Sequence, residues 1–137
     1  MMKKILLIDD DSDDRALFSE ALHDISSEIV CVTEGDGRKA LVELFDSSTE
    51  LPDVIFLDIN MPRISGWDCL DRIKSEESTK DIPVIMFSTS SHQKDIDRAC
   101  RCGAACLLTK PADYNELTES LTTLVNTVHE RSFFVYP

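Results

Sequence analysis

The chain has 137 residues and a formal net charge of −12, with 26 acidic against 14 basic side chains. This length suits one domain with its own core, and the acidic balance disfavours nucleic acid and anionic membranes as partners. No apolar run is long enough for a membrane span or a signal peptide, and five irregularly spaced cysteines favour reduced thiols, so we expect a cytoplasmic protein.

In chain order, five short apolar runs alternate with five stripes of apolar residues at helical spacing. A short apolar run predicts a buried strand, and a helical stripe predicts an amphipathic helix. The predicted strands are 4–8, 28–33, 54–58, 83–88 and 105–109. The stripes of the predicted helices lie within 17–25, 40–45, 67–73, 96–100 and 117–128. Strands that alternate with helices indicate an α/β fold, a doubly wound parallel sheet with helices on both faces.

Polar and small residues mark several element ends. We expect Ser12 or Asp13 to cap the first helix, and Gly103 to follow the fourth helix as its C′ glycine. Asp11, Asp13 and Asp14 are expected only to favour the positive end of that first helix or to be solvated. No ligand is needed to explain these three acids.

Side chains that could bind a metal ion or take part in chemistry follow four of the predicted strands. Asp9 and Asp10 follow the first strand, Asp58 ends the third, Ser88 ends the fourth and Lys110 follows the fifth. In a parallel sheet these ends converge on one edge, where ligands gather. Two carboxylates about 4 Å apart repel by roughly 4 kcal/mol at an effective dielectric constant of about 20, so three acids need a counter-charge. Oxygen ligands favour Mg²⁺, and the cation, ammonium and hydroxyl would form a phosphoryl pocket with Asp58 as nucleophile.

These motifs resemble the receiver domain of two-component response regulators. The residues that carry the resemblance are Asp9-Asp10, Asp58-Ile59-Asn60-Met61-Pro62 with Gly66 beyond, Ser88-Thr89 and Lys110-Pro111. The resemblance covers about the whole chain and implies a flavodoxin-like (βα)5 fold with five parallel strands in the order 2-1-3-4-5. We expect residues 1–131 to form this domain and 132–137 to be a short C-terminal tail, with no output domain.

The resemblance implies a role for each acid at this edge. Asp58 would be the residue that a histidine kinase phosphorylates. The side chains of Asp10 and Asp58 and the carbonyl of Asn60 would bind Mg²⁺, while Asp9 would act on the metal mainly through water.

It also implies roles for the residues around the phosphoryl group. Ser88 would be the switch hydroxyl that moves onto it, Lys110 would pair with its oxygens, and Asn60 and Thr89 would bind it. Asn60 and Ser90, each two residues past a site residue, would tune its lifetime.

The sequence also departs from the family pattern. Leu107 stands three positions before Lys110, where many receivers carry an aromatic residue whose rotation reports the switch. Movement of Ser88 would then shift the face formed by the fourth helix, fifth strand and fifth helix.

The resemblance has two further implications. The Lys110–Pro111 bond is commonly cis in the family. Residues 60–63 and 87–91 are similar to single-domain receivers associated with phytochrome-type kinases.

Three functions are compatible with these residues. The preferred one is a phosphoacceptor switch that is not an enzyme on external substrates: it takes a phosphoryl group from a histidine kinase or phosphotransfer protein and slowly dephosphorylates itself. It would signal to a downstream protein or a second copy of itself. Segment 133–136 would either fold back or serve as a docking tail.

The first alternative is a degenerate receiver that binds proteins independently of phosphorylation. The second is a small-molecule phosphatase, which Asn60 disfavours because such sites usually carry a second acid at that position.

Overall fold

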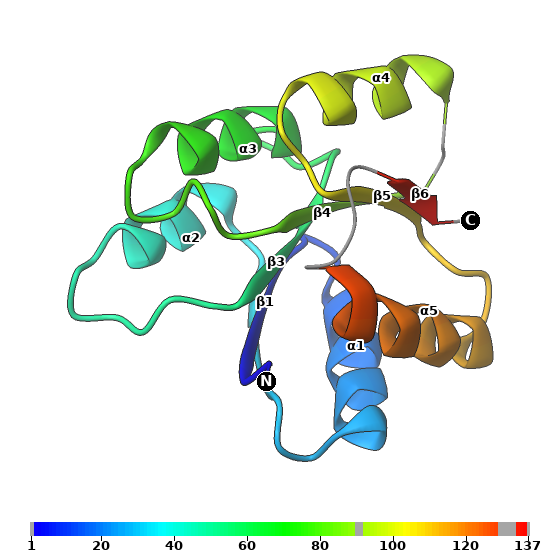
Figure 1. The fold of residues 1–137 in the computed structure, drawn as a ribbon. Coiled ribbons are helices and arrows are strands. Elements are labelled where there is room, and N and C mark those ends of the chain that lie inside the picture. The colour runs from blue at the N-terminus through cyan, green and yellow to red at the C-terminus, as the bar shows by residue number, and fades with distance from the viewer. Residues whose placement is uncertain (1, 90–91, 129–133, 137) are drawn as a thin grey trace.

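The computed structural model describes residues 2–89, 92–128 and 134–136. Strands alternate with helices along the chain, as the apolar pattern predicts (Figure 1). The elements are β1 (Lys4–Ile8), α1 (Ser12–Ile25), β2 (Val30–Glu34), α2 (Gly37–Leu44), β3 (Val54–Asp58), α3 (Gly66–Ser75), β4 (Val84–Ser88), α4 (Gln93–Arg101), β5 (Cys106–Thr109), α5 (Tyr114–Thr127) and β6 (Phe134–Tyr136).

The described strands form one parallel sheet in the order β2-β1-β3-β4-β5-β6. The first five strands keep the expected order 2-1-3-4-5, so the flavodoxin-like α/β fold is confirmed. The sixth strand was not expected: β6 pairs with β5, with Phe134 opposite Cys106. Helix α5 supplies the crossover that a parallel pair requires. Residues 134–136 of the expected tail therefore fold back onto the domain, whereas Phe133 lies outside the described residues.

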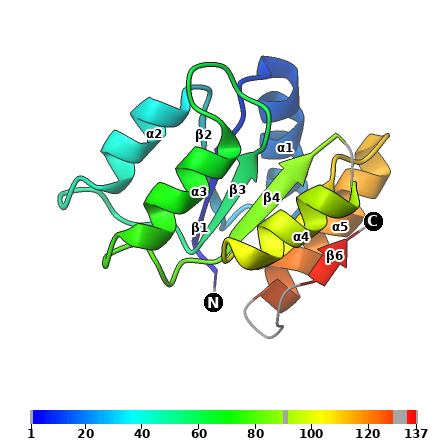
Figure 2. The same cartoon turned by 90° about the horizontal axis from the view of Figure 1, so that it is seen from above.

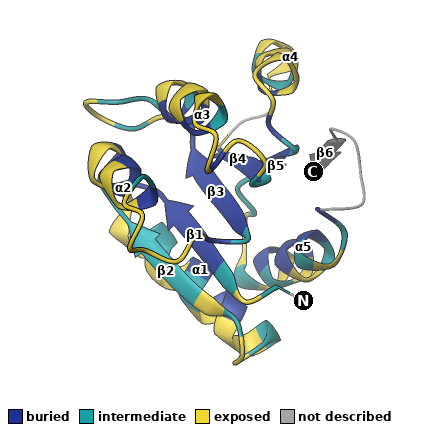
Figure 3. Ribbon diagram, turned by 60° about the vertical axis from the view of Figure 1, so that its left-hand side comes forward, coloured by how far each residue is buried: buried dark blue, intermediate teal, exposed yellow. Residues whose placement is uncertain are grey.

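The sheet separates two apolar cores. Helices α2, α3 and α4 cover one face and α1 and α5 cover the other (Figure 2). In β3, Ile55 and Leu57 join the first core while Val54 and Phe56 join the second. Figure 3 shows β1, β3 and β4 as buried strands in the middle of the sheet. Burial on both faces explains why their sequences are continuous apolar runs without polar alternation.

The helix ends confirm one expected boundary residue and correct another. Asp11, and neither Ser12 nor Asp13, is the N-cap of α1, and its carboxylate accepts hydrogen bonds from the backbone N–H groups of Asp13 and Asp14. The cap falls there because Asp11 is the last extended residue before the helix. Gly103 follows α4 with a φ of 91°, a left-handed conformation that glycine adopts without strain, as its expected C′ role requires.

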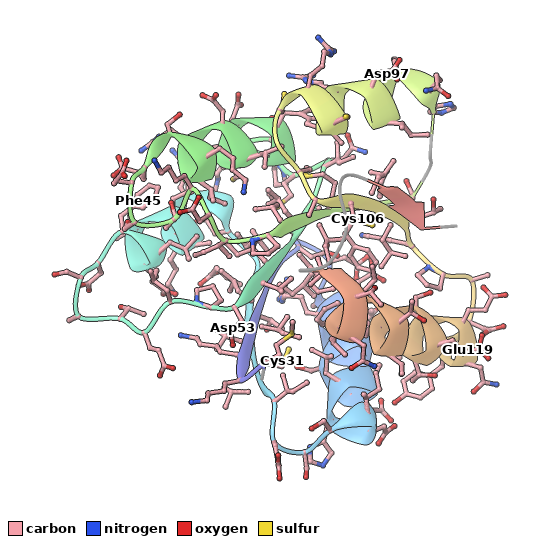
Figure 4. The ribbon with its side chains drawn as sticks, in the orientation of Figure 1. Cys31, Phe45, Asp53, Asp97, Cys106 and Glu119 are labelled. Carbon is pink, nitrogen blue, oxygen red and sulfur yellow. The ribbon has the colours of Figure 1, made fainter. Side chains whose placement is uncertain are left out.

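Charged side chains lie on the outer surfaces of the helices. Figure 4 shows Asp97 and Glu119 on the outer sides of α4 and α5, away from the sheet. The guanidinium of Arg98 lies 4.7 Å from the centre of the Trp67 ring and so links α4 to the start of α3.

Within the described ranges, none of the helices has the length and apolar character needed to span a bilayer.

Candidate functional site

Four strands bring their polar end residues to the carboxyl edge of the sheet. Asp9 follows β1, Asp58 ends β3, Ser88 ends β4 and Lys110 follows β5. Asp9, Asp58 and Ser88 are buried, and the backbone N–H of Lys110 donates to the carbonyl of Ser88 at 2.6 Å. The parallel register thus joins residues that are far apart in the sequence at the edge where α/β proteins bind ligands.

Three carboxylates gather at this edge. One oxygen each of Asp9, Asp10 and Asp58 lies within 4.8 Å of the others. Asp9 is held in place because its Oδ1 accepts a hydrogen bond from the N–H of Asp11 at 3.0 Å and its carbonyl accepts one from Arg15 at 2.8 Å. Its Oδ2 is buried and faces the Lys110 ammonium at 3.0 Å, although among the described residues it makes no hydrogen bond of good geometry. Three carboxylates this close carry more negative charge than the single Lys110 ammonium balances, and their oxygens fit a divalent cation that prefers oxygen ligands.

Lys110 places its ammonium among the acids. Its Nζ lies 2.8 Å from Oδ2 of Asp14, 3.0 Å from Oδ2 of Asp9 and 3.8 Å from Oδ1 of Asp58. The contact with Asp14 is a hydrogen bond, whereas the distance to Asp58 is too long for one. Asp14 was expected only to favour the helix end, and this expectation is wrong in that its side chain reaches Lys110. The available signal was its place on the first turn of α1, which begins at this edge.

The electrostatic environment raises the pKa of both Asp58 and Lys110. Burial, reinforced by the nearby Asp9 carboxylate, raises the pKa of Asp58 to about 7, although Lys110 opposes this change. Burial alone would lower the pKa of Lys110, but the hydrogen bond to Asp14 and the attraction of the nearby Asp9 and Asp58 carboxylates raise it. Asp58 therefore changes its charge near neutral pH while Lys110 remains an ammonium.

The residues just beyond the strand ends are more exposed. Asn60 is exposed, and its backbone N–H lies 3.4 Å from Oδ1 of Asp58. Thr89 is also exposed and directly follows the buried Ser88. Both are therefore open to a ligand that approaches from solvent. Ser90, the second residue expected to tune the phosphoryl lifetime, lies outside the described residues.

Gly66 allows α3 to begin directly against the site. A Cβ at this position would strike the carbonyl oxygen of Asp58 and would lie 2.8 Å from Cα of Ile59. The backbone N–H of Gly66 also donates to the carbonyl of Ile59 at 2.8 Å. Glycine is required here because the helix start and the strand end approach each other too closely for any side chain.

The structure also shows the environment of Leu107 and the form of the Lys110–Pro111 peptide bond, the two features compared with the family pattern. Leu107 is fully buried and packs in the core that α2, α3 and α4 share. The expected cis bond is not found, since the Lys110–Pro111 peptide is trans. The trans form is the one that X–Pro bonds generally prefer.

Comparisons with known proteins identify the family of the chain and similar proteins. Residues 5–122 match the family model described as the response regulator receiver domain. RpaA of Synechocystis, a DNA-binding dual master transcriptional regulator, is 31% identical over 124 residues, which are 90% of this chain and 49% of RpaA. The chain thus spans about half the length of that relative. The response regulator Rcp1 of Synechocystis is 30% identical over 120 residues, which are 84% of this chain and 81% of Rcp1.

Two solved structures extend the similarity over nearly the whole chain. The phosphorylated cyanobacterial phytochrome response regulator RcpA superimposes with a TM-score of 0.85 at 31% identity, covering 95% of this chain and 96% of RcpA. The Mn²⁺-bound form of Rcp1 superimposes with a TM-score of 0.82 at 27% identity, covering 93% of this chain and 95% of that one.

Proposed function

The chain belongs to the response regulator receiver domain family, and on that premise we propose that it accepts a phosphoryl group on Asp58 in a two-component phosphorelay. The observation that carries the proposal is the arrangement around the buried Asp58 carboxylate, which has two further acids and an ammonium beside it. An acceptor of this kind needs a carboxylate that can attack phosphorus and positive charge that can balance the incoming oxygens.

The transfer begins at a phosphohistidine of a histidine kinase or a phosphotransfer protein. A carboxylate oxygen of Asp58 attacks phosphorus, the P–N bond breaks and its electron pair stays on the imidazole nitrogen. Lys110, 3.8 Å from Oδ1 of Asp58, is close enough to pair with the phosphoryl oxygens after a small movement. In the later dephosphorylation a water oxygen attacks phosphorus and the P–O bond to Asp58 breaks with its electron pair left on the carboxylate. The water oxygen leaves as part of inorganic phosphate, and a proton passes to solvent. The chain is therefore a self-dephosphorylating acceptor rather than an enzyme on external substrates.

The donor set favours Mg²⁺ as the cofactor. The side chains of Asp9, Asp10 and Asp58 and the carbonyl of Asn60 would hold the ion, with Asp9 acting mainly through water. When bound, Mg²⁺ supplies positive charge to the three carboxylates and to the phosphoryl oxygens. The Mn²⁺-bound form of the similar Rcp1 supports a divalent cation as a ligand of this chain.

Phosphorylation would be read out as a change of protein surface. We assign the switch to Ser88, which would move onto the phosphoryl group beside Thr89, and we keep Asn60 and Ser90 as residues that tune its lifetime. Because Leu107 is buried in the core that includes Ala99 of α4, a shift at the end of β4 would reach α4 by packing. A downstream protein or a second copy of the chain would then bind the face of α4, β5 and α5.

The organisation of RcpA and Rcp1 supports residues 1–131 as the receiver domain, because the chain covers 96% and 95% of the chains in those two solved structures. A degenerate receiver would have no need of the buried acids or of the lysine beside them. The retained Asp9, Asp58 and Lys110 therefore favour the phosphorylated switch.

The test is intact mass spectrometry after incubation with Mg²⁺ and acetyl phosphate. The wild type is expected to gain one phosphoryl group, whereas Asp58→Asn and a sample treated with EDTA should gain none. Asp71→Asn, which alters an exposed acid on α3, is the matched control and should be phosphorylated like the wild type. Equal phosphorylation of wild type and Asp58→Asn, or none in either, would refute the proposal.

A further inference from the structure

The shortest ion pair of Lys110 joins it to α1, away from the acceptor. Its Nζ donates a hydrogen bond to Asp14 at 2.8 Å, while Oδ1 of Asp58 is 3.8 Å away. Asp14 lies 96 residues from Lys110 in the sequence and does not belong to the cluster of three carboxylates that suits a cation. The lysine that the proposed function assigns to the phosphoryl group is thus bound to another acid before that group arrives.

We propose that Asp14 is a positioning residue that competes with the phosphoryl group of Asp58 for Lys110. The inference rests on the proposed function of Asp58. The ammonium now contacts Asp9 at 3.0 Å and Asp14 at 2.8 Å, so pairing with phosphoryl oxygens beyond Oδ1 of Asp58 requires Lys110 to turn its N–H donors toward them, and this reorientation lengthens or breaks the contact with Asp14. The Asp14 contact therefore stabilises the unphosphorylated arrangement only, and it reduces the population of the phosphorylated one.

The two acids that contact Lys110 most closely differ in how readily they can release it. The side chain of Asp9 is fully buried, so a lost contact would leave a charge without water. The side chain of Asp14 is 34% exposed, so water can solvate the carboxylate when the lysine leaves. Asp14 itself stays in place because Asp11 caps its backbone N–H and the buried Phe18 anchors α1 in the core. Asp14 is therefore a fixed but releasable partner.

The test measures the affinity of beryllofluoride, a stable mimic of the phosphoryl group on a carboxylate, by calorimetric titration with saturating Mg²⁺. High ionic strength screens the general effect of a removed charge. Asp14→Asn should bind beryllofluoride about three- to tenfold more tightly than the wild type, since a partly exposed charged hydrogen bond is of that size. The matched control is Asp13→Asn, an exposed acid on the same turn, which should change the affinity less than about twofold.

Further variants separate the possible outcomes. Asp14→Glu keeps the charge and should bind like the wild type, and Asp14→Ser should repeat the gain if Asp14→Asn folds poorly. Equal affinities for the Asp14→Asn and Asp13→Asn proteins would reduce the effect to net charge and overturn the inference. Weaker binding by Asp14→Asn would mean that Asp14 holds Lys110 in the productive position, which also overturns it. In either case the proposed function stands, whereas a wild type that fails to bind beryllofluoride would refute both.

Discussion

Replacing Asp58 with asparagine should stabilise the metal-free protein, and the gain should grow as the pH rises. Burial and the neighbouring Asp9 carboxylate raise the pKa of Asp58 from its ordinary 3.8 to about 7. Between about pH 4 and pH 7 the folded protein keeps a proton on Asp58 that the unfolded chain has lost. Raising the pH across this window therefore lowers the free energy of unfolding of the wild type, and asparagine removes that loss.

The size of the effect follows from the two pKa values. A change from 3.8 to about 7, at about 1.4 kcal/mol for each pKa unit, corresponds to about 4 kcal/mol at pH 8. Local relaxation and entry of water around a buried carboxylate reduce this figure, so we expect a gain of about 2 to 4 kcal/mol. The gain should be near zero at pH 3.5, because Asp58 is then protonated in the folded protein and mostly protonated in the unfolded chain.

The assay is urea unfolding in EDTA at several pH values from 3.5 to 8, followed by circular dichroism. Asp71→Asn, on the exposed side of α3, is the control and should follow the wild type throughout. Adding Mg²⁺ should stabilise the wild type more than Asp58→Asn, because the variant loses a charged ligand. A variant that is less stable than the wild type at pH 8, or a gain that does not depend on pH, would refute the reasoning.

Three further substitutions test the local structure, each by urea unfolding. Gly66→Ala should cost about 3 kcal/mol or more, because its Cβ would strike the carbonyl oxygen of Asp58; a loss below about 1 kcal/mol would contradict the close approach. Asp11→Ala should cost about 1 kcal/mol by removing the N-cap of α1, whereas Asp13→Ala should cost clearly less. Asp53→Ala should lower the free energy of unfolding by about 1 to 2 kcal/mol, because its carboxylate accepts hydrogen bonds from two backbone N–H groups at the start of β1. An unchanged urea midpoint would mean that these hydrogen bonds do not stabilise the fold.

The fold was predictable because its determinants are local. A buried central strand such as Val54–Asp58 has no polar face, and an amphipathic helix shows its stripe directly in the sequence. The convergence of Asp9, Asp58 and Lys110 also followed, because parallel strands place their ends at one edge.

The parts that were missed depend on contacts between distant residues. The sequence places both Asp13 and Asp14 on the first turn of α1, but it does not show which of the two reaches Lys110. The cap at Asp11 was misplaced because consecutive acids can all act as caps, and backbone geometry decides between them. β6 was missed because a strand of three residues carries almost no pattern of its own and is defined by its pairing with β5.

The pairing of β6 with β5 has a consequence for the behaviour of the protein in concentrated solution. Cys106, Leu107 and Leu108 of β5 are fully buried, and without β6 their strand would present unpaired N–H and C=O groups along an apolar edge. Such an edge is a template for aggregation with other chains. Purification tags are therefore better fused to the N-terminus than to the end that carries this protective strand.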